Sequence, residues 1–395
     1  MRILVLTSLY PNPLQPNRAT FNRQQFQALA AEHDVQVIAP VAWTDEWCHR
    51  GQSDDSIPGD RQRLCDGMIV HHPRYIFTPK ILRSQYGAFF AASVRGCFAH
   101  AVRTLRPEIV LGCWAYPDGW AALRLAREES LPVAIKVHGS DLLLVDRYPA
   151  RLRRTAEAMA GADAVIAVSR GLGAQAIAIG ADPRAVAIVY NGIDTSLFHP
   201  GSRQEARSSV GYTSDDPLIV FAGNLVAVKG LDVLLEALAS LQRRGQRFQC
   251  ALIGDGPLRE SLRSRAQTLG LFPRLRFVGA RPLRELPNWY RAADVVVLPS
   301  RSEGVPNVLL EATACGVPFI ASQVGGIPEI APPHSLVRPG DSAELSDRIM
   351  SFLIGGAPTG ESPFRPGSWA DSARSLADVL RGVVDKRNHL QRRAG

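Results

Sequence analysis

The sequence predicts an α/β protein with two doubly wound parallel sheets, each covered by helices on both faces. Short runs of aliphatic and β-branched residues alternate with helical stretches rich in Ala, Leu and Arg. The runs are apolar at nearly every position, which is typical of parallel strands buried on both faces. This alternation stops after Tyr190, where residues 191–217 are rich in turn formers, and then resumes. A chain of 395 residues is long enough for two such domains.

The predicted strands follow one another in this order. In the first half they are Arg2–Thr7, Asp34–Ala39, Gly67–His71, Glu108–Gly112, Pro132–Val137, Ala164–Val168 and Ala187–Tyr190, and in the second half Leu218–Ala222, Phe248–Ile253, Leu275–Val278, Asp294–Leu298 and Val317–Ala321. Beyond them, residues 369–395 have apolar residues at helical spacing and a basic end. We therefore expect a first domain over residues 1–199, completed by the helix 369–395, and a second domain over residues 200–368. Two such domains would face each other across a cleft.

Composition excludes several classes of protein. Hydrophobic residues make up 46% of the chain and charged residues 21%, which excludes a disordered or collagen-like protein. The six cysteines lie far apart without a Cys-x-x-Cys pair, which argues against a zinc ribbon or a disulfide scaffold and suits a reducing compartment. No apolar run reaches the roughly 18 residues that a membrane-spanning helix needs. The chain is therefore expected to be cytoplasmic.

Three loops at the carboxyl ends of predicted strands in the second half are rich in glycine and polar residues. They are residues 223–230, 254–257 and 299–307. Ligands of open parallel sheets bind at this edge, and glycines with helix N-termini are suited to phosphate groups. The loop Gly254-Asp255-Gly256 begins like a dinucleotide fingerprint, but Arg259 stands where its third glycine belongs, which disfavours a nicotinamide site.

Two glutamates eight residues apart, Glu303 and Glu311, are the strongest functional signal. Pro306 suits the first turn of a helix, so that Glu303 would precede the helix and Glu311 would lie inside it. Between them, the N–H groups of three residues would form a seat for a diphosphate, with a carboxylate on each side to accept hydrogen bonds from hydroxyls. These three residues are Asn307, Val308 and Leu309. The alternative is an acidic cap followed by a solvated surface glutamate.

This stretch resembles the E-x7-E signature of retaining glycosyltransferases of family 4, which have the GT-B fold of two facing Rossmann-like domains. Further segments match the family in order along nearly the whole chain: Val137-His138-Gly139-Ser140-Asp141, Tyr190-Asn191-Gly192-Ile193-Asp194, Gly223-Asn224-Leu225 with Lys229-Gly230, Phe277-Val278-Gly279, and Gly325-Gly326-Ile327-Pro328-Glu329. Their combination and order are highly specific. Within the family, the opening residues 10–21 are most similar to bacterial enzymes of cell-surface polysaccharide assembly.

The resemblance implies a role for each matching residue. Lys229 would neutralise the donor's diphosphate, Glu311 would bind the ribose hydroxyls, and Glu303 and His138 would contact the donor sugar. The remaining donor-binding residues would be Asn224, Gly254, Gly256, Val278, Gly304, Asn307, Val308 and Leu309. Catalytic roles would fall to His138, Glu303 and Lys229.

Three positions depart from the family pattern or leave it open. Asn224 stands where the family usually has Arg, so Arg281 and Arg301 are further candidates for the diphosphate charge. Ala19 stands where the family tends to have a glycine near the diphosphate. Asp141 has an alternative role as the N-cap of the next helix.

The implied function is a retaining hexosyltransferase that moves a sugar from a nucleotide-diphosphate sugar to a hydroxyl of a glycan or lipid-linked glycan. The chain has no Asp-x-Asp, so a metal-independent reaction without a cofactor is expected, in which the acceptor attacks from the leaving group's side. Alternatives are a sugar-nucleotide epimerase of the same fold and an inert nucleotide-binding scaffold. Neither the nucleotide nor the sugar follows from the sequence.

A basic and aromatic stretch in the first half suggests peripheral contact with an anionic membrane. Residues 80–106 contain no acidic residue and carry Lys80, Arg83, Arg95, Arg103 and Arg106 with Tyr86, Phe89, Phe90 and Phe98, and a second cluster comprises Arg147, Arg151, Arg153 and Arg154. Such a stretch can lie on anionic lipid at the inner face of the cell membrane. The alternative is that the phenylalanines are core residues of an ordinary helix. Nucleic acid is not an expected partner, because no binding motif accompanies the charge.

Overall fold

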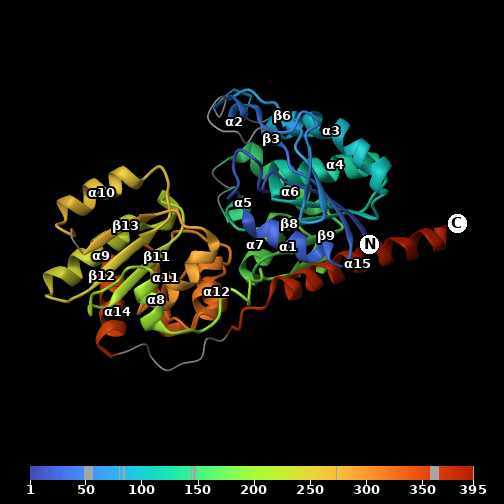
Figure 1. Ribbon diagram of the computed structural model, residues 1–395. Helices are drawn as coiled ribbons and strands as arrows, with labels where there is room; N and C mark the ends of the chain where they lie inside the picture. The colour runs from blue at the N-terminus through green and yellow to red at the C-terminus, as the bar shows by residue number, and fades with distance from the viewer. Residues whose placement is uncertain are drawn as a thin grey trace. The chain divides into compact units, whose positions relative to one another are not determined.

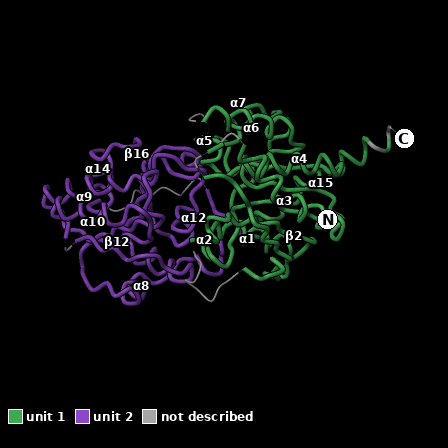
Figure 2. Tube along the Cα trace, turned by 90° about the horizontal axis from the view of Figure 1, so that it is seen from above, with its two compact units in different colours: residues 1–192, 369–395 green, residues 193–368 purple. Residues whose placement is uncertain are grey.

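The computed structural model describes residues 1–48, 57–79, 81–82, 85–143, 145, 148–272, 274–355 and 364–394. The chain forms two compact units, Met1–Gly192 with Trp369–Gly395 and Ile193–Ser368 (Figure 2). The boundary falls at Gly192 instead of residue 199, because the N–H of Ile193 donates to the carbonyl of Gly367 and ties this part of the chain to unit 2. Unit 2 is thus inserted between Gly192 and the C-terminal helix.

Within the described residues, unit 1 is built on an eight-stranded sheet of order β10-β9-β8-β7-β1-β2-β5-β4. All its neighbouring strands are parallel except β4 and β5. The strands are β1 (Arg2–Leu6), β2 (Asp34–Ile38), β4 (Gln62–Cys65), β5 (Met68–His71), β7 (Ile109–Cys113), β8 (Val133–Val137), β9 (Ala164–Ala167) and β10 (Val186–Ile188), and a separate pair is formed by β3 (Val41–Ala42) and β6 (Arg74–Tyr75). Every strand predicted for the first half is present, while β3, β4 and β6 were not predicted.

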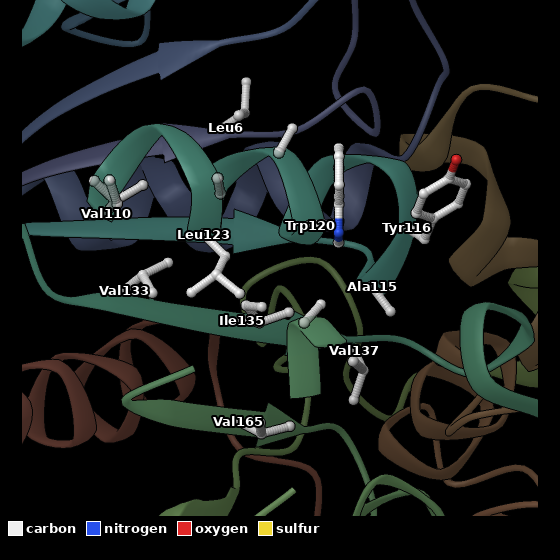
Figure 3. Close-up of a cluster of buried hydrophobic side chains, with 14 of the residues drawn as sticks. Leu6, Val110, Ala115, Tyr116, Trp120, Leu123, Val133, Ile135, Val137 and Val165 are labelled. Atoms are coloured by element: carbon white, nitrogen blue, oxygen red, sulfur yellow. The ribbon is translucent and has the colours of Figure 1, made fainter. Parts of the chain in front are cut away.

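Helices cover both faces of this sheet (Figure 1). They are α1 (Thr20–Ala30), α2 (Trp43–Cys48), α3 (Tyr86–Leu105), η2 (Ala115–Gly119), α4 (Trp120–Glu128), α5 (Ser140–Leu143), α6 (Pro149–Gly161), α7 (Arg170–Ile179), η4 (Pro183–Ala185) and α15 (Trp369–Ala394). On one face α3, α4, α6 and α7 pack on strand residues such as Val110, Ile135 and Val165 (Figure 3). On the other face α1 and α15 pack on residues such as Val5 and Leu111.

The helix α15 supplies Ala373, Leu376 and Leu380 to the core of unit 1, where Leu376 and Leu380 are fully buried. These are the apolar positions whose spacing predicts a helix with a partner surface. The predicted packing of the C-terminal helix on the first domain is therefore what the structure shows, with α15 running beside α1 (Figure 1).

A second core feature of unit 1 is the buried lysine Lys136 of β8. Its ammonium is fully buried and donates to the amide oxygens of Gln25 in α1 and Asn191 after β10, the latter at 3.5 Å. The Gln25 amide in turn donates to Ser372 in α15 (2.8 Å), whose hydroxyl donates to the carbonyl of Tyr190 (2.6 Å). One hydrogen-bonded network thus joins the sheet, α1, α15 and the segment that leads to unit 2.

Unit 2 is an open sheet that is parallel throughout, and its described residues give the order β13-β12-β11-β14-β15-β16. The strands are β11 (Leu218–Ala222), β12 (Gln249–Ile253), β13 (Leu275–Gly279), β14 (Val295–Leu298), β15 (Phe319–Ser322) and β16 (Leu336–Val337). The helices are α8 (Arg203–Ser209), η5 (Ala227–Lys229), α9 (Leu231–Arg243), α10 (Arg259–Thr268), η6 (Leu283–Glu285), α11 (Leu286–Ala292), α12 (Asn307–Ala314), α13 (Ile327–Ile330), η7 (Pro333–Ser335) and α14 (Ser342–Gly355). Only the two-residue strand β16 was not predicted here. The doubly wound α/β class predicted from the sequence is confirmed.

The buried ammonium gives a testable pH dependence. Burial lowers the pKa of Lys136 from 10.5 to about 8. Between these values the unfolded chain binds the proton that the folded chain has lost, so the free energy of unfolding rises with pH in this window. We expect the wild type to gain about 3 kcal/mol relative to Lys136→Met between pH 7 and pH 11.

Urea unfolding followed by tryptophan fluorescence measures this difference, because every tryptophan except Trp289 lies in unit 1. The matched control is Lys386→Met, which removes an exposed lysine of α15. For Lys386→Met, the difference from wild type in the free energy of unfolding should stay constant with pH. The same constancy for Lys136→Met would contradict the prediction.

Candidate functional site

The candidate site of unit 2 is the carboxyl edge of its sheet, where the loops after neighbouring strands interlock. The N–H of Leu225, after β11, donates to the carbonyl of Asp255, after β12, at 2.9 Å. The N–H of Arg301, after β14, donates to the carbonyl of Val228, after β11, at 2.7 Å. Backbone hydrogen bonds therefore fix the loops that carry the predicted site residues to one another.

Two glycines bring these loops closer together than other residues allow. Gly230 has φ +65°, and a Cβ there would lie 2.0 Å from the carbonyl oxygen of Pro299. Gly325 has φ +55°, and a Cβ there would lie 1.7 Å from the carbonyl oxygen of Glu303. Only glycine adopts both conformations without steric cost. The first approach sets Lys229, the neighbour of Gly230, against the loop that contains Glu303.

Lys229 and Glu303 form an ion pair. The Nζ of Lys229 lies 2.6 Å from Oε1 of Glu303, and the Ser300 hydroxyl donates to the same oxygen at 2.6 Å. Both side chains are largely buried, with 20% and 11% exposed, so solvent screens this pair less than a surface pair. The sequence assigns these residues to different parts of a ligand and does not predict their pairing, and it gives no role to Ser300.

The helix α12 differs from the prediction at its first turn. Pro306 is its N-cap and Asn307 its first residue, so the proline precedes the helix. The N–H of Leu309 donates to the carbonyl of Pro306 at 3.1 Å and is not available to a ligand in this structure, contrary to the expectation. The helix nevertheless begins at the predicted edge, since Asn307 and Val308 directly follow the loop of Glu303.

Glu311 lies in the second turn of α12 and is buried, which excludes the solvated surface glutamate of the alternative interpretation. The hydroxyl of Tyr290, in α11, donates to Oε2 of Glu311 at 2.8 Å. Burial raises the pKa of Glu311 to about 7, and the hydrogen bond from Tyr290 opposes this rise. Tyr290 itself is fully buried, and burial raises the pKa of its hydroxyl well above the ordinary value. No motif or spacing in the sequence points to Tyr290.

The remaining predicted residues of unit 2 occupy the same edge. Asn224 is exposed and Val278 is half-buried. Gly254 and Gly256 lie against the backbone that follows β11. A Cβ on Gly254 would lie 1.9 Å from the Gly223 oxygen, and a Cβ on Gly256 would lie 2.6 Å from the Leu225 oxygen. Gly304 accepts a hydrogen bond from the N–H of Gly326 at 2.8 Å.

The two arginine candidates for the diphosphate charge have protein partners. Arg301 forms a bidentate pair with Asp232, with distances of 2.9 and 2.6 Å. Arg281 donates to the carbonyl of Val278 at 3.2 Å and lies 3.9 Å from Glu285. Of the three candidate cations, Lys229 is therefore the one that the structure bonds to a predicted carboxylate.

In unit 1, the predicted residue His138 follows β8 at the carboxyl edge of the first sheet. Asp141 accepts hydrogen bonds from the backbone N–H groups of His138 (3.1 Å), Gly139 (2.8 Å) and Ala115 (3.1 Å). It lies within α5, so it is not the N-cap of this helix. Asp141 instead holds the backbone on both sides of the predicted histidine and ties it to the loop after β7.

The imidazole of His138 is held in a buried setting. Its ring centre lies 5.0 Å from that of Phe21 in α1, and its Nε2 has no hydrogen-bond partner among the described residues. Burial, with a smaller effect of the Lys136 charge, lowers the pKa of His138 well below its ordinary value. The imidazole is therefore neutral at pH 7, with one ring nitrogen as a donor and the other as an acceptor.

Ala19 stands in a backbone conformation that favours glycine. It is the N-cap of α1 with φ 47° and ψ 49°, in the left-handed region. An L-residue in this region costs about 1 kcal/mol relative to glycine.

The structure does not support lipid contact by the aromatic residues of α3. Phe90 and Phe98 are buried in the core of unit 1 and Phe89 is half-buried, because α3 packs its apolar face on the sheet. Arg95 pairs with Glu128. Lys80, Arg83 and Arg147 lie outside the described residues, whereas Arg103, Arg106, Arg151 and Arg153 are exposed and Arg154 pairs with Glu157 at 2.9 Å.

Comparison with known proteins identifies the family. The model described as "Glycosyltransferase Family 4" matches residues 19–197, and that described as "Glycosyl transferases group 1" matches residues 202–362. A D-inositol 3-phosphate glycosyltransferase of Catenulispora acidiphila is 32% identical over 348 residues, which are 82% of this chain and 74% of that relative. The chain belongs to glycosyltransferase family 4. A teichuronic acid biosynthesis glycosyltransferase of Bacillus subtilis, TuaC, is 29% identical to this family 4 enzyme, with 89% of both chains covered.

Solved structures agree on the fold of this family 4 glycosyltransferase. A sucrose-phosphate synthase from Thermosynechococcus elongatus superposes with a TM-score of 0.75 at 20% identity and covers 99% of this chain and 98% of its own. Anabaena HepE, solved in complex with UDP, superposes with a TM-score of 0.69 at 19% identity and covers 99% of both chains. The two Rossmann-like units are therefore those of the GT-B fold.

The role of Asp141 can be tested with Asp141→Asn. An asparagine has one acceptor oxygen, and its NH₂ group would face a backbone N–H from which the carboxylate now accepts a hydrogen bond. Two donors would then face each other. We expect the free energy of unfolding to fall by about 1–3 kcal/mol. The matched control is Asp163→Asn, because Asp163 accepts one hydrogen bond, from the N–H of Val133, that an amide oxygen can also accept. Chemical denaturation of both variants provides the comparison, and equal losses would show that Asp141 has no special role.

Proposed function

We propose that this family 4 enzyme transfers a hexosyl group from a nucleotide-diphosphate sugar to a hydroxyl of a glycan or lipid-linked glycan, with retention of configuration at the anomeric carbon and without a metal ion. The observation that carries the proposal is the arrangement of Lys229, Glu303 and Glu311 around the start of α12 at the carboxyl edge of one sheet. A cation, a helix N-terminus and two carboxylates match a diphosphate flanked by two hydroxyl-bearing groups.

Similar proteins support the donor assignment. HepE has been solved with UDP and with UDP-glucose, and two relatives are named glycosyltransferases of D-inositol 3-phosphate and of teichuronic acid biosynthesis. In this proposal Lys229 and the N-terminus of α12 bind the diphosphate, and Glu311 binds the ribose. Gly254, Gly256 and Val278 approach the nucleoside.

The ion pair between Lys229 and Glu303 allows Lys229 to exchange its partner when the donor binds. A diphosphate that binds Lys229 replaces the carboxylate as the partner of the ammonium. Glu303 is then able to accept hydrogen bonds from the hydroxyls of the donor sugar, while Ser300 still fixes its orientation. Binding of the diphosphate and recognition of the sugar are thereby coupled through one pair of side chains.

The leaving nucleoside diphosphate needs stabilisation as its bond to the sugar breaks. Lys229 supplies a positive charge, and the start of α12 adds the partial positive charge of a helix N-terminus. The acceptor hydroxyl attacks the anomeric carbon from the side of the leaving group and gives its proton to a diphosphate oxygen. The new glycosidic bond therefore forms with retention as the bond to the diphosphate breaks. His138 contacts the donor sugar through its neutral imidazole, which brings no charge close to the reacting carbon.

We also propose that unit 1 touches an anionic membrane that carries the lipid-linked acceptor, through exposed apolar residues instead of α3. Trp47, Ile76, Ile81 and Leu82 are between 55% and 65% exposed. The pairing of β3 with β6 brings the segments after these strands together, and the indole of Trp43 donates to the carbonyl of Phe77 at 2.8 Å. Within the described residues no helix is long and apolar enough to cross a bilayer.

The proposed reaction is tested with a panel of UDP-, GDP- and ADP-sugars and candidate acceptors. Mass spectrometry detects the transferred sugar, and NMR of the product gives the anomeric configuration. Turnover that survives EDTA and yields an α-linkage from an α-donor is the expected result. A changed donor sugar in the absence of acceptor indicates an epimerase instead, and an inverted product contradicts the proposed mechanism.

The roles of Lys229 and Glu311 predict large losses of transfer in an intact fold. We expect Lys229→Met to lower kcat/KM by about a hundredfold or more, because Asn224 offers no second charge in the same loop. Glu311→Ala should raise the donor KM. Arg265→Met is the control, since Arg265 of α10 pairs with Glu236 of α9 and its side chain is 51% exposed. Near-normal transfer by Lys229→Met, with circular dichroism unchanged, would refute the diphosphate assignment.

Membrane contact is tested by sedimentation with liposomes. The protein should pellet with anionic vesicles at low salt and be released as salt rises, because screening weakens the attraction. Trp47→Ser with Ile81→Ser should reduce the pelleted fraction, whereas Leu390→Ser, at an exposed position of α15, should not. Equal recovery with neutral and anionic vesicles would contradict this part of the proposal.

A further inference from the structure

No motif or spacing in the sequence predicts the pair formed by Tyr290 and Glu311. The two residues lie on successive helices of unit 2, α11 and α12, and their side chains meet in the interior. Tyr290 is fully buried, with its ring centre 6.1 Å from that of Phe198, and Glu311 is 8% exposed. Packing therefore fixes the phenol ring, and its hydroxyl holds the carboxylate at 2.8 Å.

The surroundings of Glu311 offer little other stabilisation for a negative charge. Among the described elements, α12 packs mainly against α11, β14 and β15, and neither strand contains a titratable residue. From α11 come Tyr290 and Arg291, whose guanidinium donates to the carbonyls of His199 and Leu197. Cys315, the C-cap residue of α12, is buried, and burial raises the pKa of its thiol to about 11. Among the described residues, the Tyr290 hydroxyl is thus the side chain that donates to this carboxylate.

We propose that Tyr290 is a positioning residue for Glu311: its buried hydroxyl orients the carboxylate and favours the ionised form, so that Glu311 can accept hydrogen bonds from the ribose hydroxyls of a nucleoside diphosphate. The inference rests on the proposed function, which makes Glu311 the ribose ligand. The hydrogen bond from Tyr290 occupies one acceptor position of Oε2, and an ionised carboxylate keeps several others. A protonated carboxyl offers weaker, neutral hydrogen bonds to the same hydroxyls.

The proposal predicts a pH-dependent defect in Tyr290→Phe. Loss of the hydroxyl removes the effect that opposes the raised pKa of Glu311, so this pKa moves above about 7 and a smaller fraction of the carboxyl is ionised at neutral pH. We expect binding of a nucleoside diphosphate to weaken about tenfold at pH 6.5 and no more than about twofold at pH 9, where the carboxyl is ionised in both proteins.

The experiment titrates UDP, GDP and ADP into the full chain by calorimetry from pH 6.5 to 9, and continues with the nucleotide that binds most tightly. The donor KM and kcat are then measured over the same range. The KM should rise in Tyr290→Phe while kcat changes little, because Glu311 contacts the nucleoside and not the reacting carbon. The matched control is Tyr212→Phe, which removes a hydroxyl bonded to the carbonyl of Asp216 elsewhere in unit 2.

A double variant keeps the test valid if Tyr290→Phe loses stability. In Glu311→Gln the side chain at position 311 cannot ionise, so nucleotide binding should be weak at every pH. Adding Tyr290→Phe should then change the nucleotide affinity by less than about twofold. If Glu311→Gln weakens binding but Tyr290→Phe does so equally at pH 6.5 and pH 9, or not at all, the positioning role is overturned and the proposed function stands. If no nucleotide binds, or Glu311→Gln binds normally, the ribose assignment fails first.

Discussion

The carboxyl edge of the sheet in unit 2, which carries the candidate site, depends on backbone lying directly against backbone. At Gly230 and Gly325 the neighbouring carbonyl oxygens occupy the positions that a Cβ would fill, so any side chain would separate the loops and with them Lys229 and Glu303. A flexible lysine gains a fixed position because its loop cannot move independently of the loop opposite. Preorganisation of this kind lets a charged group act on a ligand without reorganising first.

Three buried titratable groups, Lys136 and Asp141 in unit 1 and Glu311 in unit 2, share a second constraint: neutral partners hold them. Lys136 donates to amide oxygens, Asp141 accepts from backbone N–H groups, and Glu311 accepts from a phenol. Exposed arginines such as Arg95 and Arg301, by contrast, pair with carboxylates. A neutral partner fixes the position of a buried group but neutralises no charge, so burial shifts the pKa of Lys136 and Glu311 toward neutrality. Such groups stay responsive to pH and to an incoming charge.

The sequence predicts what repeats along the chain and misses what depends on distant neighbours. Continuous apolar runs identify the parallel strands, and the apolar spacing in residues 369–395 identifies a helix that needs a partner. The antiparallel strand β4 escapes this pattern because most of its residues are exposed at the sheet edge, and β3, β6 and β16 are too short to leave one. In the site, the spacing of Glu303 and Glu311 locates the helix start. Their partners Lys229 and Tyr290 are 74 and 21 residues away, so only the fold reveals the pairing.

The insertion of unit 2 into unit 1 has a consequence for synthesis of the chain. A ribosome completes every strand of the first sheet before unit 2, but Leu376 and Leu380 emerge only after unit 2 has been made. Domains generally fold as units in the order in which they are synthesised. Here the second unit can finish first, while the nascent first unit leaves part of one face of its sheet, beside α1, uncovered until α15 is synthesised. During that interval the exposed apolar surface is the part of the molecule that most needs a chaperone.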